Sequence, residues 1–273
     1  MSAHRLIIVA LFCLFCPGSR AGDNPYGSGA RFGAMANASV ALWDIWSGNH
    51  NQAGLAKIDH LSASLFYEDR YSIKEMGVKA LAIVLPTTSG NFSVNYSQYG
   101  FRLYNSSKMG LAYALQLGKH LWAGVQIDYF QLHFQQIHGN HNTFTFETGI
   151  LAEPLPDFFV GFHIFNPIQE TIHTLEGNEK LPTMARLGWA WILSPEFLLS
   201  METEKDLHNL LRTRVGLEYQ IVKQVTLRAG AATNPEILTA GIGFHLKHIN
   251  TDIAFSRHPV LGYSPALSFN LIF

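Results

Sequence analysis

The chain has 273 residues, and 19 Lys and Arg against 20 Asp and Glu give it a formal net charge of −1. This balance does not favour nucleic acid as a partner, because nucleic-acid-binding proteins concentrate cationic charge. Hydrophobic residues make up 48% of the chain, aromatic residues 12% and charged residues 14%. Such a composition fits a soluble β protein or a transmembrane barrel in which every second strand residue faces lipid.

The first residues predict a secretory signal peptide. Two basic residues precede an apolar run over residues 6–15, and a cleavage site follows Ala21. The run is too short to cross a bilayer as a helix, which takes about 20 apolar residues. Both cysteines, Cys13 and Cys16, lie within the predicted signal peptide. The mature protein would therefore leave the cytosol without disulfides, stabilised by a large core or by a membrane.

A segment rich in small residues, from Gly29 to Ala56, precedes every predicted strand. Its apolar residues recur at three- and four-residue spacing, which predicts a short helix with one apolar face. They are Phe32, Met35, Ala36, Val40 and Trp43. One helical segment before a long series of strands indicates a helix enclosed by a sheet or packed against it.

From Leu61 onward, period-two alternation predicts fourteen strands. They lie near residues 61–70, 76–85, 90–98, 109–117, 120–134, 143–153, 157–166, 183–193, 196–204, 210–221, 224–232, 236–247, 249–257 and 264–273. A tilted membrane strand needs about 9 to 11 residues. The residues that remain suit short connections.

The connections fall into two alternating classes. Every second one is predicted to be a tight turn, at residues 86–90, 117–120, 154–156, 193–195, 222–224 and 246–248. The others are generally longer and more polar, notably residues 97–108, 135–142, 166–182 and 257–263. Outer-membrane barrels have short periplasmic turns and long external loops. The sequence therefore predicts an all-β transmembrane antiparallel barrel of about 14 strands, with both chain ends on the periplasmic side and an N-terminal helical hatch inside the lumen.

The end of the chain carries a further pattern. Apolar residues occupy every second position and the last residue is aromatic, as in Leu267, Phe269, Leu271 and Phe273. This arrangement resembles the signal that the outer-membrane insertion machinery reads. We therefore expect these four residues to direct membrane insertion.

If the apolar set of each strand faces lipid, the other set lines the lumen. Its charged members are Glu68, Lys79, Asp128, Glu147, Arg186, Glu202, Arg212, Arg214, Glu218 and Arg228. The densest group, from Arg186 to Arg228, lies on consecutive strands, which predicts cross-strand ion pairs. These charges would form a polar path or a contact surface for the hatch. Alternatively, they only form a polar wall in which the acidic and basic side chains neutralise one another. We favour this second interpretation.

The sequence gives little support to a metal site or an enzyme. The pairs His138 with His141 and His245 with His248 have no third ligand of suitable spacing. Outer-membrane hydrolases use Ser and His, but no Gly-x-Ser-x-Gly is present. Ser256 and His258 are two residues apart, a spacing that is common by chance. We therefore expect no catalytic residue, no cofactor and no metal.

Two stretches of the opening segment resemble a known family. They are Gly29-Ala30-Arg31 through Ala38-Ser39-Val40-Ala41, and Asn51-Gln52-Ala53-Gly54-Leu55-Ala56. Both resemble the start of FadL superfamily outer-membrane proteins, most closely the PorV/PorQ-type proteins of Bacteroidetes. Gln52 stands where that superfamily usually has proline. The resemblance implies a signal peptide over 1–21, a hatch over 22–56 and a fourteen-stranded barrel over 57–273, in the bacterial outer membrane.

The resemblance also implies two different functions on one architecture. FadL-type proteins pass hydrophobic molecules such as long-chain fatty acids, so the first hypothesis is passage of a hydrophobic small molecule, with Asn51 to Leu55 shifting. The alternative is an accessory barrel of type IX-like protein secretion or surface assembly, in which residues 166–182 hold a partner protein. A soluble secreted β protein is the third possibility. The expected partners are outer-membrane lipids and either a hydrophobic ligand or a secretion-system protein.

Overall fold

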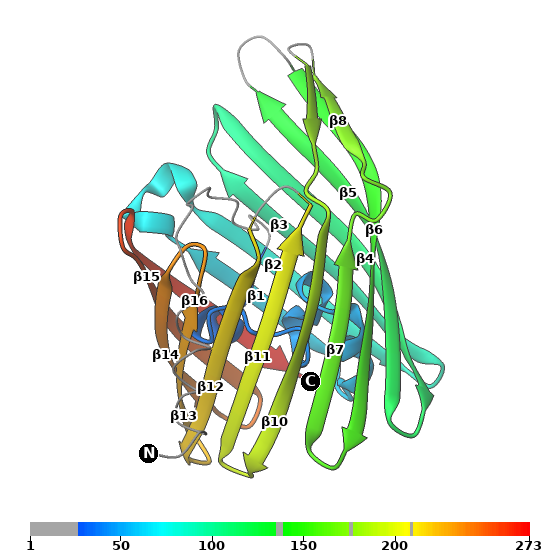
Figure 1. Cartoon of the computed structure of the whole chain (residues 1–273), viewed down its shortest axis with the longest axis vertical. Helices are drawn as coiled ribbons and strands as arrows, with labels where there is room; N and C mark the ends of the chain where they lie inside the picture. The colour runs from blue at the N-terminus through cyan, green and yellow to red at the C-terminus, as the bar shows by residue number, and fades with distance from the viewer. Residues whose placement is uncertain (1–26, 135–138, 175–176, 208–209) are drawn as a thin grey trace, which may run out of the picture.

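Fourteen strands of the computed structural model form one closed antiparallel barrel (Figure 1). The structure describes residues 27–134, 139–174, 177–207 and 210–273. Each barrel strand pairs with its neighbours around the sheet, and the first pairs with the last. The barrel strands are β1 (Ser62–Glu68), β2 (Val78–Thr87), β3 (Gly90–Gly100), β4 (Tyr104–Gly118), β5 (Leu121–Phe134), β6 (Gly139–Leu155), β7 (Phe158–Phe165), β10 (Met184–Ser194), β11 (Phe197–Asp206), β12 (Arg212–Val222), β13 (Val225–Ala232), β14 (Ile237–His245), β15 (Ile249–His258) and β16 (Gly262–Ile272). The predicted fourteen-stranded barrel is confirmed, and its closed sheet leaves no backbone edge facing lipid.

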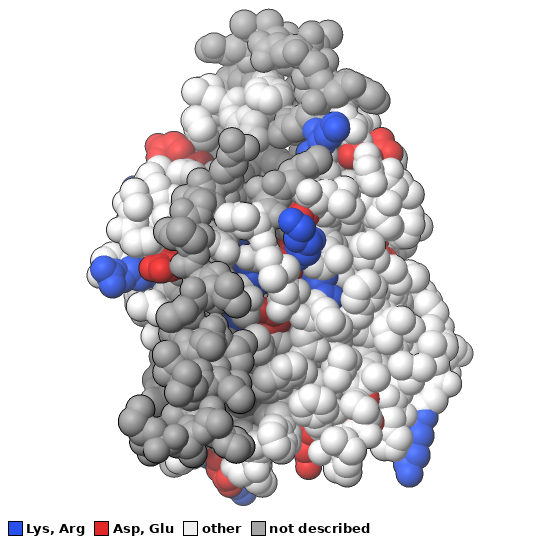
Figure 2. Space-filling model, in the orientation of Figure 1, with Lys and Arg blue, Asp and Glu red and all other residues white. Residues whose placement is uncertain are grey.

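The strand pattern separates an apolar outer face from an inner face of mixed polarity. Along β2, Ala80 and Ala82 are buried inside, whereas Leu81 and Ile83 are exposed outside. Figure 2 shows that the broad wall in the lower half of the view carries almost no charge, with charged atoms at its lower edge. Lipid requires such a wall, because charged side chains facing the hydrocarbon core cost free energy.

Connections at one end of the barrel are tight turns, as predicted. They consist of residues 88–89, 119–120, 156–157, 195–196, 223–224 and 246–248. The start of β1 and the end of β16 lie at this end too, because the N–H of Phe273 bonds to the carbonyl of Leu61. Outer-membrane barrels place such turns in the periplasm. We therefore call this the periplasmic end and the other the external end.

Connections at the external end differ in part from the prediction. The long loop predicted over 97–108 is wrong, because β3 continues to Gly100 and β4 begins at Tyr104. Its polar residues stay extended because they pair with β5 up to Phe134. The loop predicted over 257–263 likewise shrinks to 259–261, and that over 135–142 lies partly outside the described residues.

The two sides of the barrel have different heights. β6 has 17 residues whereas β1 has 7. The predicted loop over 166–182 contains a separate two-stranded sheet of β8 (Thr171–Thr174) and β9 (Gly177–Lys180). Figure 1 shows β8 beside the raised ends of β5 and β6 at the top, with the loop that follows β1 well below them. That loop holds two short 3₁₀ helices, η3 (Arg70–Ser72) and η4 (Lys74–Met76).

Residues 28–57 run through the inside of the barrel, as the blue ribbon in Figure 1 shows. We call them the lumenal segment. It contains the helix α2 (Ala30–Ala34) and two 3₁₀ helices, η1 (Ile45–Asn49) and η2 (Gln52–Lys57). The predicted helix with an apolar face reaching Trp43 is wrong. The chain turns away after α2, because Ala36 and Asn37 adopt left-handed φ values of 54° and 59°.

The lumenal segment supplies the apolar core of the molecule. Phe32, Met35, Trp46 and Leu55 are almost completely buried and belong to one cluster with inward residues of the wall. Among the described residues, no helix combines the length and the apolarity needed to cross a membrane. The boundary predicted at residue 22 and the predicted signal peptide lie outside the described residues.

Candidate functional site

The first half of the lumenal segment is held against β12 to β16 by hydrogen bonds. The N–H of Ala30 donates to the hydroxyl of Ser268 at 2.8 Å. The hydroxyl of Thr239 accepts from the N–H of Ala36 at 3.0 Å and donates to the carbonyl of Ala34 at 2.7 Å. One wall hydroxyl therefore satisfies two backbone groups at the end of α2, where a helix leaves such groups unpaired.

Arg31 joins α2 to a line of charges on the wall. Its guanidinium donates to both carboxylate oxygens of Glu218, at 2.9 and 3.0 Å. Glu218 also accepts from Arg228 at 2.6 Å, and Arg228 donates to Asp252 at 2.7 Å. Two-point pairs between Arg and a carboxylate fix geometry as well as charge. The hatch-motif residue Arg31 thus contacts Glu218, which links it through Arg228 to Asp252.

Glu202 connects the middle of the segment to the wall. Its Oε2 atom accepts the backbone N–H groups of Ser39 at 2.9 Å and Val40 at 2.8 Å. Its Oε1 atom accepts from Arg214 at 2.6 Å. Glu204, two residues further on β11, pairs with Arg214 and Arg186 but forms no hydrogen bond to the described part of the segment. The predicted cross-strand ion pairs are therefore present.

His50 is a buried, uncharged connector within the segment. Its Nε2 atom lies 2.8 Å from the carbonyl of Ser28, and its Nδ1 atom lies 2.8 Å from the hydroxyl of Ser39. A carbonyl can only accept, so Nε2 carries the proton and Nδ1 accepts from Ser39. Burial, with a smaller contribution from the charge of Arg186, lowers the pKa of His50 to about 3. The imidazole is neutral at physiological pH.

The second half of the segment packs against β3 to β7. The Asn51 side chain donates to the carbonyls of Val40 at 2.6 Å and Ile150 at 3.1 Å. Gln52, at the position usually held by proline, donates to the Gly48 carbonyl at 3.0 Å and to Glu147 at 2.8 Å. An amide thus forms bonds that a proline could not form.

Glycines of the wall allow this close contact. A Cβ atom added at Gly124 would lie 2.7 Å from the backbone nitrogen of Ala53, and one at Gly149 would collide with the Asn51 side chain. At Gly161 it would collide with the carbonyl of Val40. Real Cβ atoms do not approach other atoms so closely. The inward glycines therefore leave space that the backbone of the lumenal segment fills.

A buried polar cluster lies behind η2. Lys108 forms ion pairs with Glu147 and, at 3.5 Å, with Asp128, and Glu147 also contacts His163 at 2.8 Å. All four residues are buried. Buried charges need partners to offset the cost of removing them from water. The cluster provides these partners from four consecutive strands.

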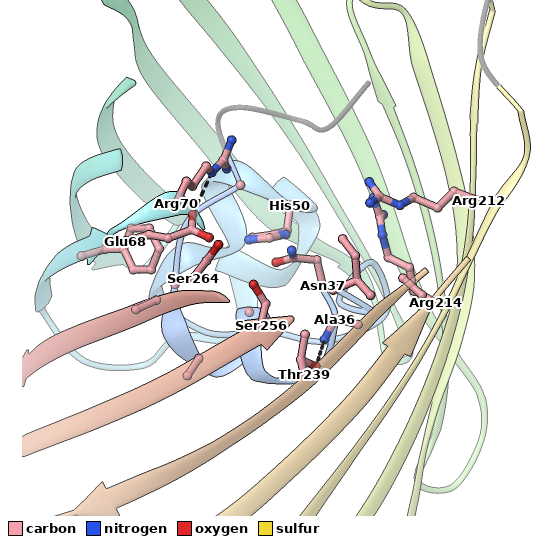
Figure 3. A pocket seen from close by; sticks show the side chains of 18 of the residues that line it. Ala36, Asn37, His50, Glu68, Arg70, Arg212, Arg214, Thr239, Ser256 and Ser264 are labelled. Carbon is pink, nitrogen blue, oxygen red and sulfur yellow. Dashed lines mark hydrogen bonds and ion pairs between the residues drawn. The ribbon is translucent and has the colours of Figure 1, made fainter. Parts of the chain in front are cut away.

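The segment separates two cavities. The external cavity, of about 70 Å³, is bordered by Gly29, Gly33, Ala36 and His50 of the segment (Figure 3). Figure 3 shows Arg212 and Arg214 on one side of it, and Ser256 and Ser264 on the other. The periplasmic cavity, of about 550 Å³, is bordered by residues 42–45 and by strand ends near the tight turns.

The predicted site residues are placed as follows. Of the hatch motif, Gly29 and Ala30 lie at the start of α2, while Ala53, Gly54 and Leu55 are buried in η2. Leu267 and Phe269 lie exposed on the outer face, Leu271 is partly covered, and Phe273 is 68% exposed at the chain end. Their role in membrane insertion stays a prediction.

The placement of Lys79 in the lumen is wrong. Its neighbours Val78 and Ala80 are buried and Lys79 is exposed, so its side chain points outward. Both faces of β2 are largely apolar, and its inward residues can be apolar because the segment, and not water, fills this part of the lumen. The other nine predicted lumenal charges lie on the inner face.

Sequence reasoning missed three lumenal residues. Lys108 was assigned to a loop, whereas His163 and Glu204 have the strand parity of the neighbouring inward residues Gly161 and Glu202. The alternation of inward and outward positions could have assigned His163 and Glu204 to the lumen. Lys108 could be assigned only with the start of β4 at Tyr104.

The structure places the residues of the Ser256 and His258 pair in different surroundings. Ser256 faces the external cavity, whereas His258 accepts the N–H groups of Val260 and Leu261. No group of three or more His, Cys, Asp or Glu in the described part of the chain is arranged to hold a metal. His138 lies outside the described residues.

Comparison with known proteins gives a structural likeness only. No protein-family model matches the chain, and no curated protein matches it. Among solved structures, the toluene transporter TodX of Pseudomonas putida gives a TM-score of 0.71 at 11% identity, over 92% of this chain and 99% of that chain. The monoaromatic hydrocarbon channel CymD gives 0.68 at 12% identity, over 92% and 99%. A FadL homologue of Pseudomonas aeruginosa gives 0.63 at 13% identity, over 94% and 99%.

The fold is that of the FadL-type outer-membrane barrels. A closed barrel with an apolar outer wall is the architecture that a location in the outer membrane requires. Transporters and channels, not enzymes, are the structures it is similar to. None of those named above belongs to a secretion system, so the finer resemblance to PorV/PorQ-type proteins and the type IX-like alternative gain no support from them.

Proposed function

We propose that the barrel passes a hydrophobic small molecule across the outer membrane, with the lumenal segment acting as a hatch between two cavities. The observation that carries this proposal is the position of that segment, which closes the lumen between a cavity on the external side and one on the periplasmic side. The similar structures are named as transporters of toluene and channels for monoaromatic hydrocarbons, which supports the same class of cargo.

The lining of the external cavity suggests which molecules fit. Five apolar residues of β1 and β13 to β16 border it, namely Phe66, Ala232, Ile237, Ala254 and Ala266. Arg186, Arg212 and Arg214 border it from β10 and β12. A molecule with an apolar body could place a polar or anionic group toward the arginines. We therefore include both a hydrocarbon and a fatty carboxylate as test molecules.

The hatch must move for passage to occur. A cavity of about 150 Å³ is known to hold benzene in another protein. The external cavity has about 70 Å³, so it is too small for such a molecule unless the segment moves. α2 borders the external cavity at Gly33, where an added Cβ atom would meet nothing closer than the Ala254 Cβ at 3.9 Å. Residues 51–55, by contrast, border neither cavity and lie directly against Gly124 and Gly149. We therefore place the movement in α2 rather than in the sequence-predicted stretch from Asn51 to Leu55.

A reversible tether tests the proposal. Residues 17–273 contain no cysteine, so the double variant Gly33→Cys, Ala254→Cys introduces one possible disulfide. The Cβ separation of 3.9 Å matches that of natural disulfides, about 3.8 Å. Purified barrels in liposomes are assayed for uptake of labelled toluene and labelled dodecanoate, before and after reduction. The single variant Gly33→Cys is the matched control.

The outcomes separate transport from hatch movement. We expect uptake by the wild type and by the single variant, loss of uptake by the oxidised double variant, and recovery on reduction. Wild-type liposomes that take up neither molecule faster than empty liposomes would overturn the transport proposal. Full uptake by the oxidised double variant would overturn the role of α2 as the moving part.

A further inference from the structure

The outer face of the barrel carries an unexpected set of charges at the external end. At this end of the described barrel strands, the charged side chains that point outward are Lys79, Lys205 and Arg257, and all three are cationic. Lys79 lies between Tyr67 and Gln98 of the adjacent strands, and Arg257 lies opposite Tyr263. Tyrosine and cationic residues of this kind typically occupy the level of lipid headgroups.

Two of these cations adjoin three loops that form one surface. The loops are residues 69–77, 101–103 and 259–261, and they follow one another around the barrel. The hydroxyl of Ser72 donates to the carbonyl of Tyr263 at 3.1 Å, and the Tyr71 ring packs against His258 with centroids 5.9 Å apart. The N–H of Gly100 donates to the carbonyl of Gly77 at 3.1 Å. We call these loops, with Lys79 and residues 257–263, the low rim.

The low rim holds four exposed cations and few anions. Lys74, Lys79, Arg102 and Arg257 are exposed, whereas Glu75 is the exposed acid of the same described residues. Within the part of the chain that the structure describes, no ion pair or side-chain hydrogen bond engages these four cations. The lumenal cations Arg31, Lys108 and Arg228, by contrast, are all paired. A cluster of unpaired cations attracts anions.

Large apolar side chains stand beside these cations. Val260 is 84% exposed at the tip of its loop, and Ile73, Phe101 and Leu103 are about half exposed. Figure 1 shows the loop after β1, in cyan, beside the red connection between β15 and β16, both far below the raised ends of β5 and β6. The 7 residues of β1 span at most about 23 Å along the strand, and the tilt of the strand lowers the height that they cover. Because the apolar band of such barrels is about 25 Å tall, these loops meet the membrane surface.

We propose that the low rim binds a phosphorylated lipid of the outer leaflet. Lys74, Lys79, Arg102 and Arg257 contact the phosphate groups, while Ile73, Phe101 and Val260 contact the acyl chains. The combination of unpaired cations with exposed apolar tips fits an anionic amphiphile, since cations near a membrane surface favour anionic headgroups. This site lies on the outside of the barrel, so it does not depend on the transport proposed for the lumen.

The test compares lipids that differ in phosphate. Native mass spectrometry of the barrel in detergent measures the fraction bound to diphosphoryl lipid A, to monophosphoryl lipid A and to phosphatidylethanolamine. The site variant is Lys79→Gln, Arg102→Gln, Arg257→Gln. The matched control is Lys119→Gln, Lys223→Gln, Lys247→Gln, which removes the same charge from exposed positions at the periplasmic turns. The mobility of unheated protein in electrophoresis verifies that each variant is folded.

We expect the wild type and the control variant to bind diphosphoryl lipid A most tightly. The site variant should bind it about tenfold more weakly or worse, because each cation near a membrane surface contributes measurably to binding. Equal binding of all three lipids, or equal loss in both variants, would overturn the proposal. Competition by millimolar inorganic pyrophosphate alone, with no acyl chains needed, would show a free-phosphate site and overturn the lipid assignment.

Discussion

Two residues of the lumenal segment, His50 and Arg31, form their hydrogen bonds in different charge states. His50 joins Ser28 to Ser39 as a neutral imidazole, whereas Arg31 reaches the wall as a charged group. A neutral buried group needs only its hydrogen bonds satisfied, whereas a buried charge also needs a countercharge. Protonation would give His50 a buried charge, so its hydrogen bonds within the segment depend on pH.

We predict that the contribution of His50 to docking of the segment is lost as the pH falls. His50 has a pKa of about 3 when docked and about 6.5 when exposed. The released state therefore binds more protons between these values, so the stability that is present above pH 6.5 is lost as the pH drops toward 3. Hydrogen exchange of residues 28–57, corrected for intrinsic rates, measures this at pH 7.5 and 5. Burial raises the pKa of Asp44 in the same segment to about 7, which favours docking as the pH falls. His50→Gln should therefore leave a segment whose docking strengthens with falling pH relative to the wild type, and an unchanged slope in that variant would assign the dependence to another group.

At the scale of elements, the two halves of the segment are attached by different devices. α2 is held by hydroxyl groups and by Arg31, whereas η2 is held by side-chain amides, and glycines of the wall leave space for both. The link between the halves is Glu202 on β11, which accepts two backbone N–H groups. Hydrogen bonds to a charged acceptor contribute about 1.5–3 kcal/mol each.

Glu202→Gln should therefore loosen the middle of the segment. We expect faster amide exchange at Ser39 and Val40, because a neutral acceptor binds these N–H groups less strongly. Glu204→Gln is the matched control, since Glu204 lies on the same strand and pairs with Arg214 but forms no hydrogen bond to the described part of the segment. Equal acceleration in both variants would mean that the change in wall charge, and not the two hydrogen bonds, governs docking.

At the scale of the whole molecule, an apolar outer wall closes around a charged and filled lumen. The wall satisfies every requirement of a lipid environment except at its two ends, where charges and loops gather. The terminal residue Phe273 lies at the periplasmic end, next to the start of β1. It is the last of the apolar residues that occupy every second position of the last strand.

Replacing Phe273 should reduce the amount of protein in the outer membrane. We expect Phe273→Gln to lower the folded, membrane-inserted fraction several-fold, because the aromatic end of the last strand is predicted to direct insertion. Membrane fractionation with electrophoresis of unheated samples measures this fraction. Leu210→Gln, at an exposed position between β11 and β12 and outside the low rim, should insert normally. Normal insertion of Phe273→Gln would remove the terminal residue from the insertion signal.

The strands were predictable because side-chain alternation is local. Apolar residues at every second position between polar ones, as in Phe92, Val94 and Tyr96, indicate a half-buried strand without any knowledge of its neighbours. The tight turns were predictable for the same reason. The extent of β4 was not, since its polar residues from Tyr104 to Lys108 are held extended by pairing with β5 and not by their own pattern.

The sequence by itself determined the closed fourteen-stranded barrel, the end at which the turns are short, and the presence of a small-residue segment ahead of it. Only the tertiary structure decided how that segment closes the lumen. The Gln52 contact with Glu147 joins residues 95 positions apart, and the Arg31 contact with Glu218 joins residues 187 positions apart. Such contacts depend on the register of strands far away in the chain. For the same reason Lys79 faces lipid and not the lumen, because the segment, which is remote in sequence, supplies the apolar partners of β2.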